Sequence, residues 1–397
     1  MTLILLILLG AVAFFIVISG LVFFHELGHY SVARLFGVAV ERFSIGFGKP
    51  IWRHRAKSGT EWVFASIPLG GYVKFLGDAG AASNPDSEQL AKIKADLDEK
   101  HGAGVSDSVF HFKPLWQRVL VVLAGPIANF ILAAVIFTGF FMAYGKNDLI
   151  TEVAEIMDDT PAQRSGLEVG DRILKMDGKD IRLFSEFRQY VILRSDQEIE
   201  VTVLRGEQQL DLSLTPMRID KKDAIGGRSQ LGYVGVRPAN RADLQISKDL
   251  NMLQASSEGV AQVGRMIVGT GTYIKRIFTG KESGRELGGI VRIAAMTGKT
   301  AADGASQDVP VKERAKDIFQ QLIYLAAALS IGLGVANLMP IPVLDGGHLL
   351  FYGYEAVAGR PLSQDKQEFG FRIGFALILG LFVILTWNDI GYVRSLF

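Results

Sequence analysis

The chain carries four apolar runs that are long enough to cross a lipid bilayer, separated by stretches in which polar residues return. They cover residues 3–24, 119–144, 318–338 and 369–387, and about 20 apolar residues suffice for a membrane-spanning helix. The first run continues in helical periodicity toward residue 36. Only Met1 and Thr2 precede it, with no basic segment, so we predict a retained helix rather than a signal peptide. The fold class expected is a polytopic α-helical membrane protein.

A β element is expected between the first two spans. Residues 62–67 and 72–76 are strand-like apolar runs, separated by a turn at 68–71. We predict a re-entrant β hairpin within a membrane-associated segment at 38–78, buried against the helices because open backbone groups cannot face lipid. The alternative is a small cytoplasmic hairpin that packs on itself. A re-entrant edge could pair with an extended substrate, through Val63, Phe64, Ala65, Gly70 and Gly71.

Residues 148–238 are predicted to form a separate small β-domain between the second and third spans. Residues 160–173 predict a helical turn, a glycine turn and a short strand, and Asp177-Gly178 predicts a hairpin turn. Alternation of apolar and polar residues at 199–206 predicts another strand, and residues 231–236 are expected to add a further strand to the domain. The pattern at 160–178 resembles a bacterial PDZ domain, which implies binding of chain ends or extended peptides. The alternative is a β-domain that acts only as a spacer or size filter.

The other expected segments follow from these boundaries. Within the stretch before the third span, residues 253–276 are amphipathic and 287–294 are apolar with glycine interruptions, so both are expected near the membrane surface. The segments are a first transmembrane helix at 1–37, a polar cytoplasmic insertion at 79–115, a second helix at 116–147, a membrane-surface region at 239–315, a third helix with its following motif at 316–350, and a fourth helix with a C-terminal tail at 351–397.

Composition and charge agree with partial membrane residence. The apolar fraction is 49%, the mean hydropathy is +0.26 and the net charge is +1, so no global field favours nucleic acid. The absence of cysteine excludes disulfides, thiolate ligands and a cysteine nucleophile. Basic residues between the first two spans predict a cytoplasmic loop there, with the β-domain outside, although three before the third span favour the reverse. These are Arg34, Arg42, Lys49, Arg53, Arg55, Lys57, Lys113 and Arg118, and then Lys312, Arg314 and Lys316.

An HExxH motif lies inside the first apolar run. On a helix, His25 and His29 share one face and can bind one Zn²⁺, and Glu26 between them can act as a general base on water. A chance match is the alternative. Ionisable groups within a membrane segment cost several kcal/mol, about 2.5–3.5 kcal/mol each on insertion scales, which disfavours chance. The motif therefore predicts peptide hydrolysis within the membrane, toward the cytoplasmic side.

A third ligand is expected after the third span. Pro340 and Pro342 break the helix, and the glycines that follow Asp345 permit close approach of another backbone. Asp345 is thereby delivered at membrane depth, although it could instead cap the following helix. His348 lies one helical turn further along and could bind the metal instead, but a role in supporting the metal ligands or in packing is favoured. A ligand role is not expected for the histidines in polar loops, which are His54, His101 and His111.

Together these motifs resemble the site-2 protease family of intramembrane metalloproteases, and within it the bacterial proteases that cleave anti-sigma factors. Residues 124–130 also match a feature of the family, whereas one PDZ domain stands where well-known members of that subgroup carry two. The resemblance implies that zinc is bound by His25, His29 and Asp345 and that Glu26 also protonates the leaving amine. It further implies that Asn337 donates to the oxyanion or holds the substrate backbone. Alternatively, Asn337 satisfies a broken helix end.

The expected function is that of an intramembrane zinc endopeptidase. Its expected substrate is a single-span membrane protein, implied by the resemblance to be a pre-cleaved anti-sigma factor in the bacterial inner membrane, whose cleavage releases a soluble regulator. The other partners expected are the lipid bilayer and a peptide ligand of the PDZ domain, with no nucleic acid. One rival is a PDZ-bearing membrane scaffold or receptor with a structural metal site. A metal transporter is disfavoured because, apart from Asn129 and Asn337, few further polar residues lie along the spans.

Overall fold

The computed structural model describes residues 3–77, 105–222, 228–239, 245–280, 289 and 311–394. The chain divides into two compact units, each described separately below. The first comprises Met1–Phe137, Val260–Ile267 and Gly289–Trp387, and the second comprises Thr138–Gly259, Val268–Gly288 and Asn388–Phe397.

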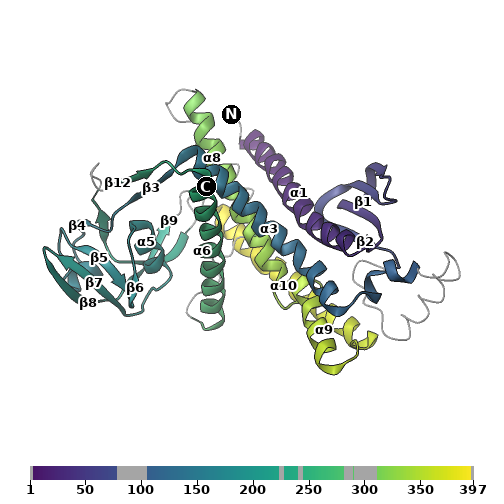
Figure 1. The fold of residues 1–397 in the computed structure, drawn as a ribbon. Coiled ribbons are helices and arrows are strands. Elements are labelled where there is room, and N and C mark those ends of the chain that lie inside the picture. The colour runs from purple at the N-terminus through teal and green to yellow at the C-terminus, as the bar shows by residue number, and fades with distance from the viewer. Residues whose placement is uncertain are drawn as a thin grey trace. The chain divides into compact units, whose positions relative to one another are not determined.

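Four long helices dominate the chain, and their apolar parts are long enough to cross a membrane (Figure 1). They are α1 (Leu3–Leu35), α3 (Leu115–Tyr144), α8 (Val311–Asn337) and α10 (Gln364–Arg394). The candidate spans within them are Phe15–Leu35, Leu115–Tyr144, Phe319–Asn337 and Gln364–Ile390. The expectation of four spanning helices is therefore confirmed for the described residues.

Helices α1 and α3 approach each other closely at Gly28. A Cβ atom on Gly28 would overlap the main-chain oxygen of Ala124 and lie 2.8 Å from the Ala128 side chain. Glycine is therefore required for the helix backbones to touch. This contact brings the side chains that flank Gly28 on α1 directly against α3.

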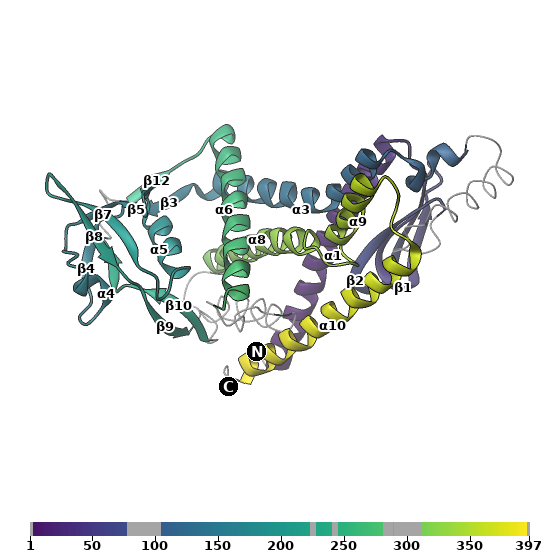
Figure 2. The same cartoon turned by 90° about the horizontal axis from the view of Figure 1, so that it is seen from below.

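The β element is a folded antiparallel pair, β1 (Val40–Arg55) and β2 (Glu61–Phe75), beside the C-terminal half of α1 (Figures 1 and 2). Residues 42–45 of β1 pair on one side with 61–64 and on the other with 71–74, while 52–55 pair with the far side of 61–64. The expected hairpin between 62–67 and 72–76 is therefore wrong, because a segment of β1 separates those two runs. Charged residues and the left-handed glycines Gly46 and Gly48 interrupt β1, which hid its strand character.

This register decides which residues lie at the edge of the sheet. Val63 pairs with both Ser44 and Arg53, and Phe64 likewise has partners on both sides, so these two residues occupy an inner strand and their expected role as a pairing edge is wrong. Ala65 pairs with Pro50 on one side. Gly70 and Gly71 belong to the outer segment, whose other side is paired with none of the described strands. A Cβ on Gly71 would lie 2.8 Å from Val22 and 3.0 Å from Glu26, so one face of this outer segment packs against α1.

Residues 109–111, within the expected polar insertion, are buried. Residues 105–112 form two short 3₁₀ turns, η1 (Val105–Ser108) and η2 (Phe110–Phe112). Phe110 is buried and stacks on Phe75, with ring centroids 4.7 Å apart. His111 is also buried, contrary to its expected place in a polar loop. Residues 79–104 of the expected insertion lie outside the described residues.

The chain folds back sharply between α8 and α9 (Asp345–Ala358). A Cβ on Gly346 would lie 2.5 Å from the Leu338 oxygen, and one on Gly347 would lie 2.6 Å from Pro342, so both positions require glycine. Val343 takes a φ of +104°, a strained conformation for a β-branched residue, which the surrounding loop must hold in place.

An ion pair fixes α9 to the start of α3. Arg118 donates to both carboxylate oxygens of Glu355, at 3.1 and 2.5 Å, and its guanidinium lies 5.0 Å from the centroid of the Tyr352 ring. Both partners are largely buried. Because Asp345 begins the same helix, this bidentate pair restricts the position of that carboxylate.

The second unit contains a four-stranded antiparallel sheet in the order β6-β5-β7-β8, with α5 packed on its core. Ile199, Val201 and Val203 alternate inward along β7 as expected from the sequence. Its strands and helices are β3 (Lys146–Leu149), β4 (Val153–Ile156), α4 (Pro161–Arg164), β5 (Arg172–Met176), β6 (Lys179–Asp180), α5 (Phe184–Ile192), β7 (Ile199–Arg205), β8 (Gln208–Leu214), β9 (Met217–Lys222), β10 (Arg228–Tyr233), β11 (Val236–Pro238) and β12 (Gln245–Lys248).

Helix α6 (Met252–Phe278) matches the amphipathic stretch expected at 253–276. Asn251 caps it by accepting from the main-chain amide of Gln254 at 2.9 Å. The apolar, glycine-interrupted stretch expected at 287–294 lies outside the described residues, apart from Gly289.

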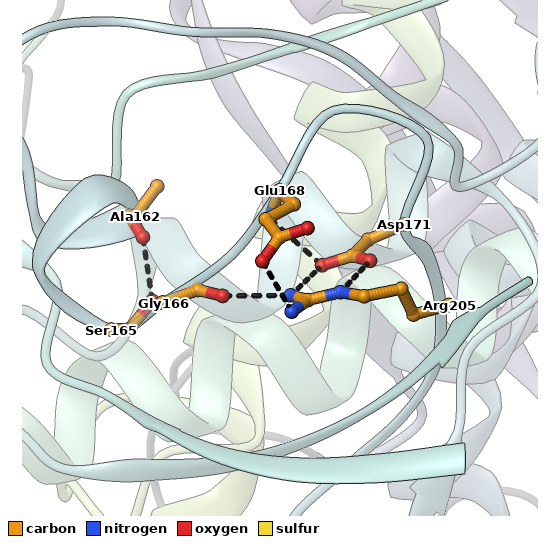
Figure 3. Close-up of polar contacts among 6 residues, drawn as sticks. All are labelled: Ala162, Ser165, Gly166, Glu168, Asp171 and Arg205. Atoms are coloured by element: carbon orange, nitrogen blue, oxygen red, sulfur yellow. Dashed lines mark hydrogen bonds and ion pairs between the residues drawn. The ribbon is translucent and has the colours of Figure 1, made fainter. Parts of the chain in front are cut away.

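A partly buried ion pair secures the loop before β5 to strand β7 (Figure 3). Arg205 donates to both oxygens of Asp171 at 2.8 Å, to Glu168 at 2.6 Å and to the Gly166 carbonyl at 2.7 Å. Burial acts to raise the pKa of Asp171, but the hydrogen bonds from Arg205 and from the Glu168 amide outweigh it and hold that pKa below its ordinary value.

Candidate metal centre

Three side chains from distant parts of the chain converge at one point. The His25 and His29 Nε2 atoms are 3.2 Å apart, and Oδ2 of Asp345 lies 3.3 Å from the first and 3.5 Å from the second. The two imidazoles come from one face of α1, one turn apart, and the carboxylate comes from the first residue of α9. These three residues form a group that could hold a metal ion, as the sequence predicts.

The dimensions of this group suit zinc. Ligands about 2.0–2.1 Å from a tetrahedral Zn²⁺ lie about 3.3 Å from one another, which matches the three observed separations. Oδ2 of Asp345 is buried and has no hydrogen-bond partner, an arrangement that is costly unless a cation compensates it. Two imidazoles and one carboxylate leave a fourth position open, as catalytic zinc sites do.

Helix α3 holds both imidazoles from behind. His29 Nδ1 donates to the Val121 carbonyl at 2.8 Å, which leaves a lone pair on Nε2 directed at the other ligands. The amide nitrogen of Asn129, which is fully buried, lies 3.1 Å from Nδ1 of His25. A Cβ on Gly125 would lie 2.5 Å from Cε1 of His29 and 2.9 Å from Cε1 of His25, so the imidazoles need glycine there.

A cavity of about 510 Å³ adjoins the three ligand atoms. Glu26 is buried in its wall, and Gly70 and Gly71 of the sheet edge form another side. Asn337, the last residue of α8, places its amide nitrogen 3.3 Å from Nε2 of His25. The Glu26 carboxyl group, the Asn337 amide and the strand edge at Gly70 and Gly71 therefore border the same space as the three residues that could hold a metal ion.

The remaining predicted residues fall outside the group of ligands. His348 and His111 line the cavity but do not belong to the three-residue group. His54 lies on the sheet, with its ring 6.0 Å from that of Trp52, and His101 is outside the described residues.

The supporting roles of Gly125 and Asn129 were not foreseen from the sequence. The available signal was their spacing of four residues, which places a very small and a polar residue on one face of an otherwise apolar helix.

Comparisons with known proteins agree with this geometry. The family model described as "Peptidase family M50" matches residues 13–381. Over 384 residues the chain is 41% identical to "Metalloprotease MmpA" of Caulobacter vibrioides, covering 97% of this chain and 96% of that protein. Over 380 residues it is 41% identical to "Putative zinc metalloprotease Atu1380" of Agrobacterium fabrum, covering 96% and 95% of the two chains. The chain belongs to peptidase family M50.

Proposed function

We propose that this protein is an intramembrane zinc endopeptidase that hydrolyses a peptide bond within or near the transmembrane segment of a single-span membrane protein. The observation that carries the proposal is the convergence of His25, His29 and Asp345, with donor atoms 3.2–3.5 Å apart. Both imidazoles lie in the candidate span Phe15–Leu35. The names of the relatives, which include zinc metalloproteases, favour the same metal and the same class of reaction.

His25, His29 and Asp345 would hold the zinc ion. Bound zinc supplies Lewis acidity, which polarises a carbonyl group and makes water a stronger acid. Glu26 accepts the proton of the attacking water at its carboxylate and returns it to the nitrogen of the departing amine. Its burial in the cavity wall beside the two histidines supports this role.

Asn337 is proposed to donate its amide N–H to the carbonyl oxygen of the scissile bond. Its nitrogen already lies 3.3 Å from a ligand atom, which puts a donor beside the place where negative charge develops. Removal of one such donor typically costs ~10²–10³ in rate.

The outer segment of β2 is proposed to hold the substrate as an added strand. A transmembrane helix must unwind before hydrolysis, and its freed backbone groups need new partners in lipid. Gly70 and Gly71 lie at the edge of the sheet and line the cavity, which supports pairing there. The wider proposal, that the β1–β2 sheet is a re-entrant element, draws support from exposed apolar side chains such as Ile51 and Trp52.

The substrate class we propose is a single-span protein already shortened on the outer side, such as an anti-sigma factor, in the bacterial inner membrane. Basic residues of the first connection favour a cytoplasmic active site and an outward β-domain. Residues 148–238 are proposed to form a PDZ domain that binds an extended peptide or chain end. Its four-stranded sheet, α5 and the hairpin turn at Asp177-Gly178 support this assignment.

Glu26→Gln tests the proposal in full-length protein reconstituted in liposomes with candidate single-span proteins. The variant should bind zinc as wild type does and should lose ~10²–10⁴ of the cleavage rate, because only the general base is removed. Cleavage by the variant at the wild-type rate would contradict the role of Glu26. Zinc binding without cleavage by either protein would favour a scaffold or receptor with a structural metal site.

A further inference from the structure

Nδ1 of His25, the ring nitrogen that does not face the other two ligands, lies beside the side chain of Asn129 in the middle of α3. A neutral imidazole that binds a metal through Nε2 carries its proton on Nδ1, and that N–H needs an acceptor. The group facing Nδ1 of His25 is the Asn129 amide, 3.1 Å away. For His29 the corresponding acceptor is the Val121 carbonyl, 2.8 Å from Nδ1. The Nδ1 atom of His29 therefore faces a main-chain group, whereas that of His25 faces a side chain that mutation can change.

Asn129 is firmly held where it meets His25. Its side chain is fully buried, and its main-chain oxygen accepts a hydrogen bond from Ser330 Oγ of α8 at 2.8 Å. The amide lies with its nitrogen toward His25 and its Oδ1 buried without a hydrogen-bond partner. In this orientation the amide oxygen, rather than the amide nitrogen, lacks a partner among the described residues.

Metal binding favours the opposite orientation of the Asn129 amide, with Oδ1 toward His25. An amide that donates to Nδ1 requires the proton of His25 to sit on Nε2, the atom that faces His29 and Asp345. That proton would have to leave before an ion could bind there. A primary amide keeps its shape when its oxygen and nitrogen exchange places, so a half-turn brings Oδ1 to Nδ1 without moving the helix.

We propose that Asn129 is a positioning residue for the metal site. With the ion bound, its Oδ1 accepts the Nδ1–H of His25, which fixes the tautomer and the ring orientation that direct Nε2 at the ion. This inference rests on the proposed zinc site and adds to it a residue that touches neither the ion nor the substrate.

Two substitutions of nearly equal size separate an acceptor role from simple packing. Asn129→Asp keeps an oxygen acceptor at the same place, whereas Asn129→Leu fills the same space without one. We expect the Leu variant to bind Zn²⁺ ~10–100-fold more weakly than wild type. The Asp variant should bind at least as tightly as wild type. The measurement is competition with a chromophoric chelator, using full-length protein in detergent micelles, with thermal unfolding of the metal-free proteins as the check on folding.

The outcomes distinguish this inference from the proposed function. Unchanged zinc affinity in a folded Leu variant would overturn it, and so would an Asp variant as weak as Leu. Failure of wild type to bind zinc would instead overturn the proposed function. If the Leu variant does not fold, ¹⁵N-histidine spectra of zinc-loaded wild type, which has six histidines, provide the test. A proton on Nδ1 of His25 that is retained but shifts in Asn129→Asp, where the acceptor becomes charged, supports the inference. An unprotonated Nδ1 in wild type overturns it, and so does an Nδ1–H signal that is the same in both proteins.

Discussion

Replacement of Gly125 by alanine should weaken zinc binding, because this residue of α3 faces both imidazoles of the metal centre. The added Cβ would lie 2.5 Å from Cε1 of His29 and 2.9 Å from Cε1 of His25. Carbon atoms in contact are normally about 3.5–4.0 Å apart. The rings must therefore retreat by roughly 1 Å, about twice the tolerance of about 0.5 Å within which a binding site keeps its geometry.

The expected magnitude follows from the cost of overpacking. An extra carbon in a well-packed core typically costs about 1–3 kcal/mol. If the rings relieve the clash by turning away from the ion, the same free energy appears as a zinc affinity lower by ~5–150-fold. The assay is chelator competition on the full-length protein in micelles, together with cleavage of a single-span substrate in liposomes.

Gly139 provides a matched control in the same helix. A Cβ there would meet nothing within 4 Å, and alanine is favoured over glycine in a helix by about 1 kcal/mol. Gly139→Ala should therefore leave zinc affinity unchanged and leave stability equal or slightly higher. Wild-type zinc affinity in a folded Gly125→Ala variant would refute the close packing of α3 against the ligands.

Three further predictions test other parts of the structure. Gly374 of α10 packs against the loop that delivers Asp345, where a Cβ would overlap a carbonyl oxygen, so Gly374→Ala should lower zinc affinity while Gly380→Ala, in open space, should not. Asp171→Asn should lower the stability of the β-domain by about 2 kcal/mol at neutral pH, measured by amide hydrogen exchange. Because the folded pKa of Asp171 is depressed, the contribution of its carboxylate is complete above the ordinary pKa and is lost as pH falls through the folded value, so the difference from wild type should shrink in acid. Along an antiparallel strand the N–H groups point alternately toward the paired strand and away from it, so at one of Tyr72 and Val73 the N–H points toward the open edge. Proline at that position should reduce cleavage while zinc content stays intact. The same cleavage rate in the Tyr72→Pro and Val73→Pro variants would exclude substrate pairing at this edge.

The helices and the ligand set could be predicted from the sequence because each depends on local pattern. A run of about 20 apolar residues specifies a span, and i,i+4 spacing specifies that His25 and His29 share a face. The breaks at Pro340 and Pro342 also mark where the chain leaves the third helix before Asp345. The spans, the histidine spacing and the helix breaks require no knowledge of which distant segments touch, whereas binding of one ion by Asp345 and both histidines was implied by the resemblance.

Other features were hidden because they depend on long-range contacts. The register that places 42–45 between the two halves of β2 arises from pairings across the bent strand, which an apolar pattern does not encode. Phe110 and His111 are likewise buried although their local sequence is polar, and Phe110 stacks on Phe75 from a distant part of the chain. The need for Gly125 becomes visible only when the imidazoles of α1 are placed against α3.

Zinc X-ray absorption and metal content of wild type and Asp345→Ala test most directly whether both ends of the chain meet at one ion. In wild type we predict one zinc per chain, with nitrogen and oxygen neighbours at about 2.0–2.1 Å, two of them imidazoles, and no sulfur. In Asp345→Ala we predict the loss of one oxygen neighbour together with much weaker zinc binding. A zinc environment and affinity that are the same in both proteins would contradict the assignment of Asp345 as a ligand and, with it, the proposed metal centre.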